Sequence, residues 1–412
     1  MPNPNRWVPI SFLFAGGMIN YMDRSALSVA APLVMRDLGL DAAQLGIIFS
    51  SFFAGYTLFT FIGGYASDLF GAKRVFAVSM TAWSVFCGLT AAAVGFSSLL
   101  LLRVLFGCGE GPFGAAASKM VRNWFPPRRI ATAIGIANAG TPVGGALAGI
   151  VAGWGAARYG WRVSFVILGL LGLLWTLCWA LTVSDSPDMQ QEHRGLGSLK
   201  AQHPTLVERY KTQPRLSFYL RQPTVLATGA SFFSYAYLLY LFLSWFPSYL
   251  AMSRHLDMSR MSLLNAIPWT LGTVGLLLSG FLCDFLIRIC PDVLSARRLV
   301  LVSCLLLAAI CVSLTGFVSS LTWAVALMAV TVFCIYLTGA TYWAIIQDVV
   351  TTEHVGAVSG FVHLIANCAG IVAPAVTGLI VQATGRFTSA FLLAGGIALL
   401  GALAVAVFAR RI

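Results

Sequence analysis

Charged side chains are scarce in this sequence. Asp, Glu, Lys and Arg make up 10% of its 412 residues, whereas 58% are hydrophobic. Soluble globular domains carry about 25% charged residues. A chain with so little charge cannot cover its surface with side chains that water solvates. The composition therefore excludes an ordinary soluble protein and indicates an integral membrane protein, with the lipid bilayer as a partner.

The motifs of common enzyme and metal-binding classes are also missing. The sequence has no H-x-x-x-H pair, no nucleophile elbow and no phosphate loop, and its nine cysteines form no C-x-x-C pair. We expect no enzymatic activity, no metal site and no cofactor. A membrane enzyme or a sensor is the alternative of a different class, and a sensor is disfavoured because no sizeable soluble domain is appended.

Apolar runs that can cross a bilayer fill most of the chain. A spanning helix needs roughly 20 apolar residues, and residues 300–312 do not alternate in polarity as the strands of a membrane barrel do. We predict an all-α integral membrane protein whose twelve transmembrane helices form two pseudo-symmetric six-helix bundles, at 1–183 and 223–412, joined by a cytoplasmic linker at 184–222. The predicted spans are 8–34, 44–67, 74–95, 97–121, 130–157, 161–183, 224–250, 260–287, 298–317, 320–349, 354–382 and 387–409.

Basic residues outnumber acidic ones by 26 to 14, which gives a formal net charge of +12. In membrane proteins Lys and Arg mark cytoplasmic loops, so this charge does not indicate a nucleic-acid partner. An even number of spans places both termini on one side, and the breaks on that side hold most of the bases. We therefore predict that both termini are cytoplasmic. Outside the linker, these bases are Arg6, Lys73, Arg74, Arg122, Arg128, Arg129, Arg297, Arg298, Arg410 and Arg411.

The spacing G-x-x-x-D recurs where the second and the eighth predicted spans end. A small residue lets two helices approach closely, an Asp favours the N-terminus of the next helix, and bases hold the cytoplasmic end. The matched positions suggest an internal repeat. We predict a gating or structural role for residues of these two segments, namely Gly64, Asp68, Gly71, Lys73, Arg74 and Asp284.

Four charged residues fall inside predicted spans: Asp23 and Arg24 in the first, Arg103 and Glu110 in the fourth. A charge at the bilayer centre costs about 2.5–3.5 kcal/mol, so these residues need partners or a purpose. One interpretation is an ion-pair network that only ties two helices together. The other is a functional site, which is the default interpretation of intramembrane ionisable residues.

The charges of these four residues suggest how the site could bind an anion. With both acids ionised the charges sum to zero, and with both protonated they sum to plus two. Low dielectric and a neighbouring carboxylate both favour a protonated acid. The planar fork of an Arg suits bidentate pairing with a carboxylate. Proton loading would therefore make the site attract an organic anion.

Several strings resemble those of the major facilitator superfamily. The loop G-x-x-x-D-x-x-G-x-K-R at 64–74 resembles its signature, with Leu69 where a base is usual. Four further strings resemble the anion:cation symporter branch: N-Y-M-D-R-S at 20–25, R-V-L-F-G-C-G-E-G-P at 103–112, N-W-F-P at 123–126 and W-F-P-S-Y-L at 245–250. The chain departs from the branch at Gly114, where many members have proline. It also departs at Thr141 and His363, where galactonate-type carriers resemble each other in having Gln and Asn.

The resemblance implies a secondary active transporter of a bacterial inner membrane. It implies proton-coupled symport, as uptake by alternating access, of a small organic anion such as a sugar acid or another carboxylate. Asp23 and Glu110 would be the proton-coupling sites and Arg24 the substrate ligand, while Arg103 would tune Glu110 and seal the periplasmic side. We expect a monomer. The alternative function is a proton-driven exporter of drugs or metabolites with the same fold.

Polar and aromatic residues within the spans are candidates for further substrate contacts. The resemblance places Trp343 and His363 at substrate-contact positions, and Asn367 shares a helix face with His363. Tyr and Trp in spans can also be packing or lipid-interface residues, and a lone His can be a hydrogen-bonded packing residue. The candidate substrate-binding residues beside Arg24 are Tyr21, Tyr56, Thr141, Tyr237, Trp343, His363 and Asn367.

Overall fold

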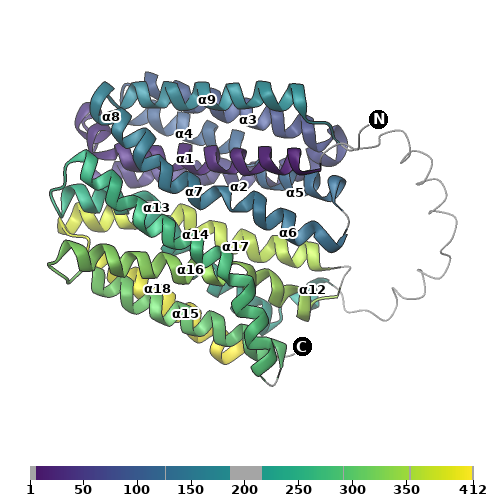
Figure 1. Ribbon diagram of the computed structural model, residues 1–412. Helices are drawn as coiled ribbons and strands as arrows, with labels where there is room; N and C mark the ends of the chain where they lie inside the picture. Colours follow the sequence, from purple (N-terminus) through teal and green to yellow (C-terminus); the bar gives the residue numbers. More distant parts are fainter. Residues whose placement is uncertain (1–5, 126, 186–215, 291, 352–353, 411–412) are drawn as a thin grey trace.

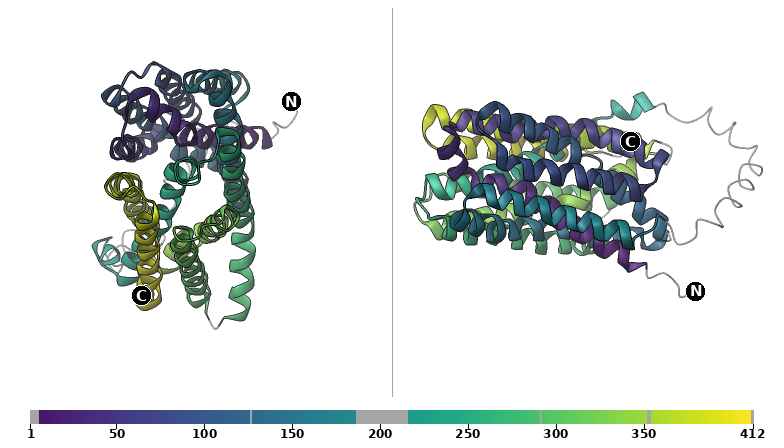
Figure 2. Two further views of the ribbon diagram at one scale, coloured as in Figure 1. Left: turned by 90° about the vertical axis from the view of Figure 1, so that its left-hand side faces the viewer. Right: turned by 90° about the horizontal axis from the view of Figure 1, so that it is seen from above.

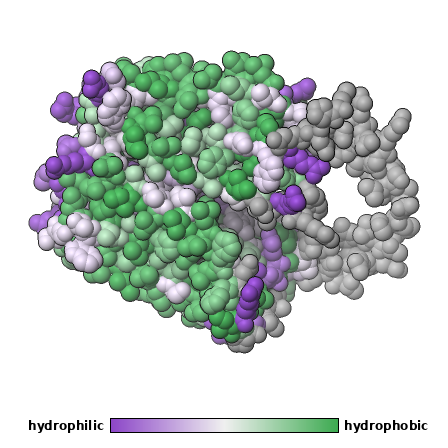
Figure 3. All heavy atoms as spheres, in the orientation of Figure 1, coloured by the Kyte–Doolittle hydropathy of each residue, from purple (hydrophilic) through white to green (hydrophobic). Residues whose placement is uncertain are grey.

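The computed structural model describes residues 6–125, 127–185, 216–290, 292–351 and 354–410, and all regular elements within them are helices. The helices lie side by side along one direction (Figure 1). The predicted all-α fold is confirmed. Figure 3 shows an apolar middle zone with polar residues at both ends, as expected for a protein that a bilayer surrounds.

The first half contains nine α-helices and two short helical turns within the described residues. Pro112 separates two helices of one span, because proline has no N–H for the helix ladder. The α-helices are α1 (Trp7–Leu38), α2 (Ala42–Phe70), α3 (Ala72–Leu89), α4 (Phe96–Glu110), α5 (Phe113–Trp124), α6 (Pro127–Asn138), α7 (Gly140–Ala148), α8 (Trp154–Tyr159) and α9 (Trp161–Thr182); a 3-10 turn η1 (Thr90–Ala92) and a π-helical turn η2 (Gly149–Gly153) complete them.

The second half begins with a short helix and continues with six long ones. These are α12 (Leu216–Leu220), α13 (Pro223–Met252), α14 (Met258–Ile289), α15 (Val293–Thr315), α16 (Leu321–Val349), α17 (Val355–Thr384) and α18 (Thr388–Phe408). Most of the predicted linker, at 186–215, lies outside the described residues. The division of the chain into two domains and a linker stays a prediction. We call the end of the molecule where α9 ends and α13 begins the linker end.

Eleven helical stretches in the described ranges are long and apolar enough to cross a membrane. α1 has 32 residues but is not among them, because Asn20, Asp23 and Arg24 lower the mean hydropathy of its middle. α1 nevertheless lies along the same direction as its neighbours and packs against α7, α9 and α13 (Figure 1). With α1 the structure has the twelve spans that the sequence predicts.

The helices before and after the linker form two groups, seen end-on in Figure 2. They meet where α2 packs on α17, α1 on α13, and α7 on α14. The Ala42 N–H donates to Gln382 Oε1 at 3.2 Å, between the start of α2 and the end of α17. A Cβ added at Gly46 would lie 2.6 Å from the Pro374 carbonyl oxygen. The two groups are therefore in tight contact at the end opposite the linker end.

The contact between the first half and α14 follows the same pattern. A Cβ at Gly149 would lie 2.5 Å from the Ser262 carbonyl oxygen, near the start of α14. Near the linker end, in contrast, a Cβ at Gly280 of α14 or at Gly360 of α17 would meet nothing within 4 Å. These spacings show that the two halves are in tight contact at the end opposite the linker end, and that Gly280 and Gly360 make no such contact.

Gly46→Ala should open the closed end. The added methyl group must push Pro374 and Gly378 away, and overpacking of this kind costs about 1–3 kcal/mol. We expect a cysteine placed at Ala42, which exposes 5% of its surface beside α17, to react at least about fivefold faster with a maleimide in purified protein, because 1 kcal/mol changes a population about fivefold.

The matched control for this variant is Gly360→Ala, which makes the same change at a helical position with free space. It should leave the labelling rate unchanged. The exposed Cys178 and Cys368 are first replaced by Ser so that they do not react. Equal labelling of the two glycine variants would show that the contact at Gly46 does not hold this end closed.

Candidate functional site

The charged residues of α1 and α4 meet inside the first bundle. Asp23 and Glu110 are fully buried, and Arg24 and Arg103 expose 5% and 3% of their surface. Arg24 Nη2 and Glu110 Oε1 form an ion pair that joins α1 to α4. Glu110 is therefore paired with the arginine of another helix and not with Arg103, which precedes it on α4.

Close packing of α4 on α2 brings aromatic rings to this ion pair. A Cβ at Gly107 would collide with the Phe52 carbonyl, and one at Gly111 would lie 2.7 Å from the Tyr56 carbonyl oxygen. Because the backbones approach so closely, the rings of α2 reach Arg24. Its guanidinium carbon lies 4.8 Å from the centroid of Phe52 and 5.1 Å from that of Tyr56.

Two more rings complete a cage around the Arg24 guanidinium. Its carbon lies 5.1 Å from the Tyr21 centroid and 5.8 Å from the Phe53 centroid. Cation–π contacts of a desolvated arginine contribute about 2 kcal/mol. Arg24 Nε has no hydrogen-bond partner in the described part of the chain. The cage thus holds a buried cation whose donors are not all used, next to the two tyrosines predicted to contact substrate.

Asp23 has a different partner from Arg24, although the two residues are adjacent. The indole N–H of Trp83, on α3, donates to Asp23 Oδ2 at 3.2 Å. Asp23 Oδ1 has no partner among the described atoms. Successive residues of a helix point about 100° apart, so the neighbours face different helices. Trp83 could not be selected from the sequence, because an indole in an apolar run cannot be distinguished from a packing residue.

Trp83→Phe should change the pH dependence of transport more than substrate affinity. The indole N–H stabilises the ionised Asp23 carboxylate, so its loss makes proton release harder. We expect the pH of half-maximal uptake to move upward and the substrate affinity to stay within about threefold, a change below 1 kcal/mol. Uptake into proteoliposomes across a pH series, with binding measured on the same protein, checks this.

Trp175→Phe is the matched control, because the Trp175 indole nitrogen is buried in the same bundle and has no hydrogen-bond partner in the described part of the chain. It should leave the pH profile unchanged. If both variants show the same profile as the wild type, the bond from Trp83 does not affect Asp23.

Arg103 contacts a different set of rings from Arg24. Its guanidinium carbon is 4.8 Å from the Phe106 centroid and 5.4 Å from the Phe52 centroid. Asp23 and Glu110 are both near enough to interact with it electrostatically. Phe52 thus contacts both arginines, whereas the rings of Tyr21 and Tyr56 contact Arg24.

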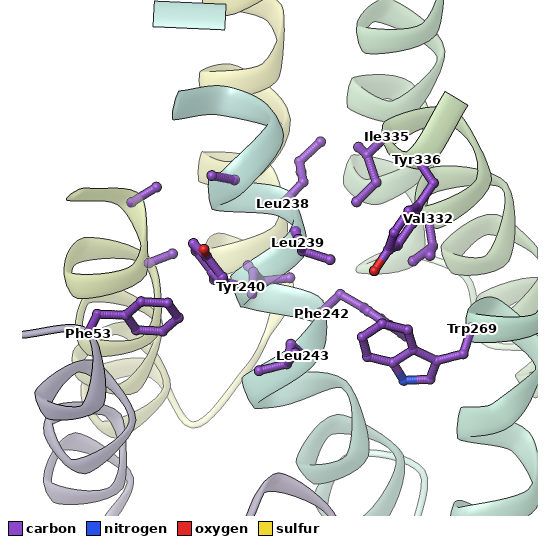
Figure 4. Close-up of a cluster of buried hydrophobic side chains, with 14 of the residues drawn as sticks. Phe53, Leu238, Leu239, Tyr240, Phe242, Leu243, Trp269, Val332, Ile335 and Tyr336 are labelled. Atoms are coloured by element: carbon purple, nitrogen blue, oxygen red, sulfur yellow. The ribbon is translucent and has the colours of Figure 1, made fainter. Parts of the chain in front are cut away.

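A polar chain in the second bundle faces this cage. The Tyr240 hydroxyl donates to Asn367 Oδ1 at 3.3 Å, and Asn367 Nδ2 lies 3.5 Å from His363 Nδ1. Tyr240 also meets Phe53 of the first bundle, with ring centroids 4.2 Å apart (Figure 4). Two candidate residues, His363 and Asn367, are therefore linked to the Arg24 cage through Tyr240.

Aromatic rings form the rest of this wall. The ring of His363 lies 5.3 Å from Trp343 and 5.9 Å from Phe232. Tyr336 lies beside Trp269 (Figure 4), and its buried hydroxyl has no hydrogen-bond partner in the described ranges. Sequence reasoning did not select Tyr336, and a tyrosine in an apolar span offered no signal for it.

Two residues that the sequence predicts to contact substrate make contacts within their own bundles. The Thr141 hydroxyl donates to the Asn138 carbonyl of the preceding turn at 2.8 Å. Tyr237 exposes 1% of its surface and packs on Phe233 at a centroid distance of 6.2 Å. The structure does not bring Tyr237 to Arg24, and the residue of α13 that approaches the cage is Tyr240.

The G-x-x-x-D segment of the first half lies at the linker end. Asp68 is exposed and forms an ion pair with Lys119 of α5 at 2.5 Å. Gly71 has a φ of +86° and starts α3. The Lys73 side chain donates to the Ala180 carbonyl at 3.0 Å, and Arg74 is exposed. The segment thus fastens α2 and α3 to α5 and α9.

Asp185 caps α3, where the sequence suggested an Asp of the motif itself. Asp185 Oδ1 accepts from the Lys73 N–H at 2.7 Å. Trp124 of the N-W-F-P string donates to the Ser184 carbonyl at 3.1 Å.

Gly64 lies near Ala115 of α5. The side chain of Asp284, in the matching segment, lies outside the described part. Within the described residues no group of three or more His, Cys, Asp or Glu could hold a metal ion.

Comparison with known proteins agrees with this architecture. The family model of the Major Facilitator Superfamily matches residues 13–365 and 285–412. Among solved structures, a D-xylose–proton symporter has a TM-score of 0.79 at 16% identity, covering 98% of this chain and 97% of that one. An inward-facing bacterial homolog of the lysosomal transporter Spinster has a TM-score of 0.77 at 19% identity, covering 99% and 96%. At these identities the likeness shows the fold alone.

Sequence relatives are transporters of small organic acids by their names. The hexuronate transporter of Bacillus subtilis is 49% identical over 409 residues, which cover 98% of this chain and 94% of that protein. The probable sulfoacetate transporter of Cupriavidus necator is 32% identical over 94% of this chain and 90% of that protein. The probable L-galactonate transporter of Escherichia coli is 27% identical over 97% and 88%. The chain therefore belongs to the major facilitator superfamily, as a multi-pass membrane transporter and not an enzyme.

Proposed function

We propose that this protein takes up a sugar acid, most simply a hexuronate, together with protons across a bacterial inner membrane. The observation that carries the proposal is the ion pair between Arg24 and Glu110, buried in an aromatic cage that faces the second bundle. The 49% identity to a hexuronate transporter supports the choice of substrate. The excess of bases at the linker end supports a cytoplasmic linker and cytoplasmic termini.

Competition for Arg24 couples the proton to the anion. While Glu110 is ionised it occupies the guanidinium, and a carboxylate that enters the cage must displace it. Protonation of Glu110 removes this competitor and leaves a buried cation that favours an anion. The substrate carboxylate then takes the place of the Glu110 carboxylate, with bidentate geometry available from the guanidinium fork.

The rest of a sugar acid fits the polar wall of the second bundle. A hexuronate carries several hydroxyl groups, which need hydrogen-bond partners when they leave water. Tyr240, Asn367 and His363 offer a connected set of donors and acceptors, and Tyr336 adds an unpaired hydroxyl. Because these residues and Arg24 belong to different bundles, a bound substrate would bridge the two halves that must move in alternating access.

Uptake into proteoliposomes tests the proposal. Radiolabelled D-glucuronate should accumulate when the outside is more acidic than the inside, and a protonophore should abolish accumulation. D-Glucose, which lacks the carboxylate, and benzoate, which lacks the hydroxyls, should compete poorly. Accumulation of the label that is the same with and without a pH gradient would contradict proton coupling. If the protein moves the label only in the direction opposite to proton flow, it is an exporter.

A further inference from the structure

A cavity of about 370 Å³ lies in the second bundle, at the end opposite the linker end. Three connections line this half-open cavity: the end of α13 with Arg254 and His255, the α15–α16 connection with Val318, and the α17–α18 connection with Arg386 and Thr388. Its volume is near the lower end of the range for small-molecule sites, about 300–1,000 Å³. The space thus suits a small organic molecule better than a single atomic ion.

The two formally charged side chains that line this cavity, Arg254 and Arg386, are both basic. No carboxylate pairs with Arg254 or Arg386 in the described part of the chain, and the nearby Asp257 faces Arg260 at 3.7 Å. Arg254 is bound by neutral acceptors only. It donates to the Tyr249 hydroxyl at 2.6 Å and to the Ser319 carbonyl at 2.8 Å. Its positive charge is therefore fixed in place and uncompensated.

The backbone adds to this positive potential. α18 has 21 residues and starts at Thr388 in the cavity wall, and its N-cap Phe387 makes no side-chain capping bond. The free N–H groups and the dipole of a helix N-terminus favour an anion. His255 is the single residue other than glycine with a positive φ, 53°, among those described. A conformation that L residues rarely adopt holds this imidazole at the cavity.

The cavity is separate from the Arg24 cage. Tyr249 in its wall is nine residues beyond Tyr240 on α13, which is about 14 Å along the helix axis. The Tyr249 ring packs on Phe387 and Phe391 within the second bundle. In addition, the passage between the bundles is closed at this end. A molecule in the cavity would therefore not be the substrate bound in the centre.

We infer that this cavity is a second anion site, which binds the carboxylate or phosphate group of a small molecule through Arg254, Arg386 and the N-terminus of α18. In the orientation proposed above it faces the outside of the cell, so that it can hold an anion while the central site is open to the cytoplasm. The orientation and the choice of a sugar acid as probe rest on the proposed function. The site itself does not.

Binding measurements on the full-length protein with its central site disabled test this inference. In an Arg24→Ala background, equilibrium dialysis with radiolabelled D-glucuronate and, separately, with inorganic phosphate should still show one site at low salt. Arg386→Ala should weaken this binding at least about tenfold. Arg158→Ala removes an exposed charge at the same end of the first bundle and should leave it unchanged. Because Arg254→Gln also removes hydrogen bonds that hold its loop, thermal melting accompanies that variant, and Arg386→Ala carries the decision.

The source of the oxyanion is distinguished by repeating the experiment in neutral detergent and in phosphatidylglycerol nanodiscs. Binding in both media identifies a soluble anion as the ligand. Binding in detergent that the phosphatidylglycerol nanodiscs suppress identifies a lipid head group that occupies the same site. No binding of either probe to the Arg24→Ala protein, or binding that Arg386→Ala leaves intact, would overturn the inference. Failure of gradient-driven uptake alone would reject the proposed function and not this site.

Discussion

Glu110→Gln should abolish uptake driven by a proton gradient while substrate binding survives. The amide cannot exchange a proton, and it no longer competes as an anion for Arg24. We expect accumulation of labelled D-glucuronate to fall at least about a hundredfold, the lower end of the effect of losing a proton-transfer group. Its affinity, measured by calorimetric titration, should stay equal or increase.

The same variant should depend on substrate for its stability. Removal of one partner of a buried ion pair leaves a buried charge and costs about 3–5 kcal/mol. A bound carboxylate restores the partner of Arg24, so substrate should raise the melting temperature more in Glu110→Gln than in the wild type. Asp257→Asn, which neutralises an exposed carboxylate, is the control and should behave like the wild type. Normal pH-driven accumulation by Glu110→Gln would remove Glu110 from the coupling scheme.

Arg24→Lys should weaken substrate binding at least about tenfold, which equals 1.4 kcal/mol. Lysine keeps the charge, but it loses the bidentate fork and the flat face that lies among Tyr21, Phe52 and Tyr56. Arg103→Lys should bind nearly normally, because the rings of Tyr21, Phe53 and Tyr56 lie around Arg24 and not around Arg103. Calorimetric titration of both variants with D-glucuronate gives the two affinities.

The comparison of these two lysine variants separates a substrate ligand from a residue that supports the acids. Arg103 interacts with Asp23 and Glu110 but is 3% exposed, so its substitution should change the pH profile of uptake rather than the affinity. Weaker binding by Arg103→Lys than by Arg24→Lys would reverse the assignment. If Arg24→Lys and Arg103→Lys both bind D-glucuronate as tightly as the wild type, the substrate carboxylate binds at another residue.

Much of the site was visible in the sequence because charge in an apolar span is conspicuous. Asp23, Arg24, Arg103 and Glu110 could be selected from their cost in a bilayer alone. Their assignment to proton coupling and substrate binding came from family resemblance and stays a prediction. Tyr21 and Tyr56 were selected as well, and the structure places both beside Arg24.

Neutral residues of the site were harder to select. Trp83 and Tyr336 lie in apolar runs where aromatic residues are common, so neither the composition nor the period of those runs marks them. On α13 the sequence favoured Tyr237, yet Tyr240 is the residue that meets Phe53 and Asn367. The two tyrosines are three positions apart, and a helix with apolar residues on every face gives no signal as to which one faces the partner bundle.

The sequence alone determined that the chain is helical and crosses a membrane, because hydrophobic length and charge cost are local properties of each segment. It also determined which ionisable residues are buried. Only the tertiary structure decided which of them pair. Arg24 meets Glu110 and not Asp23, because adjacent residues of α1 point about 100° apart and the docking of α1 on α4 brings Glu110 to Arg24. Likewise, Gly46 and Pro374, more than 300 residues apart, close one end, since such contacts depend on how whole bundles dock.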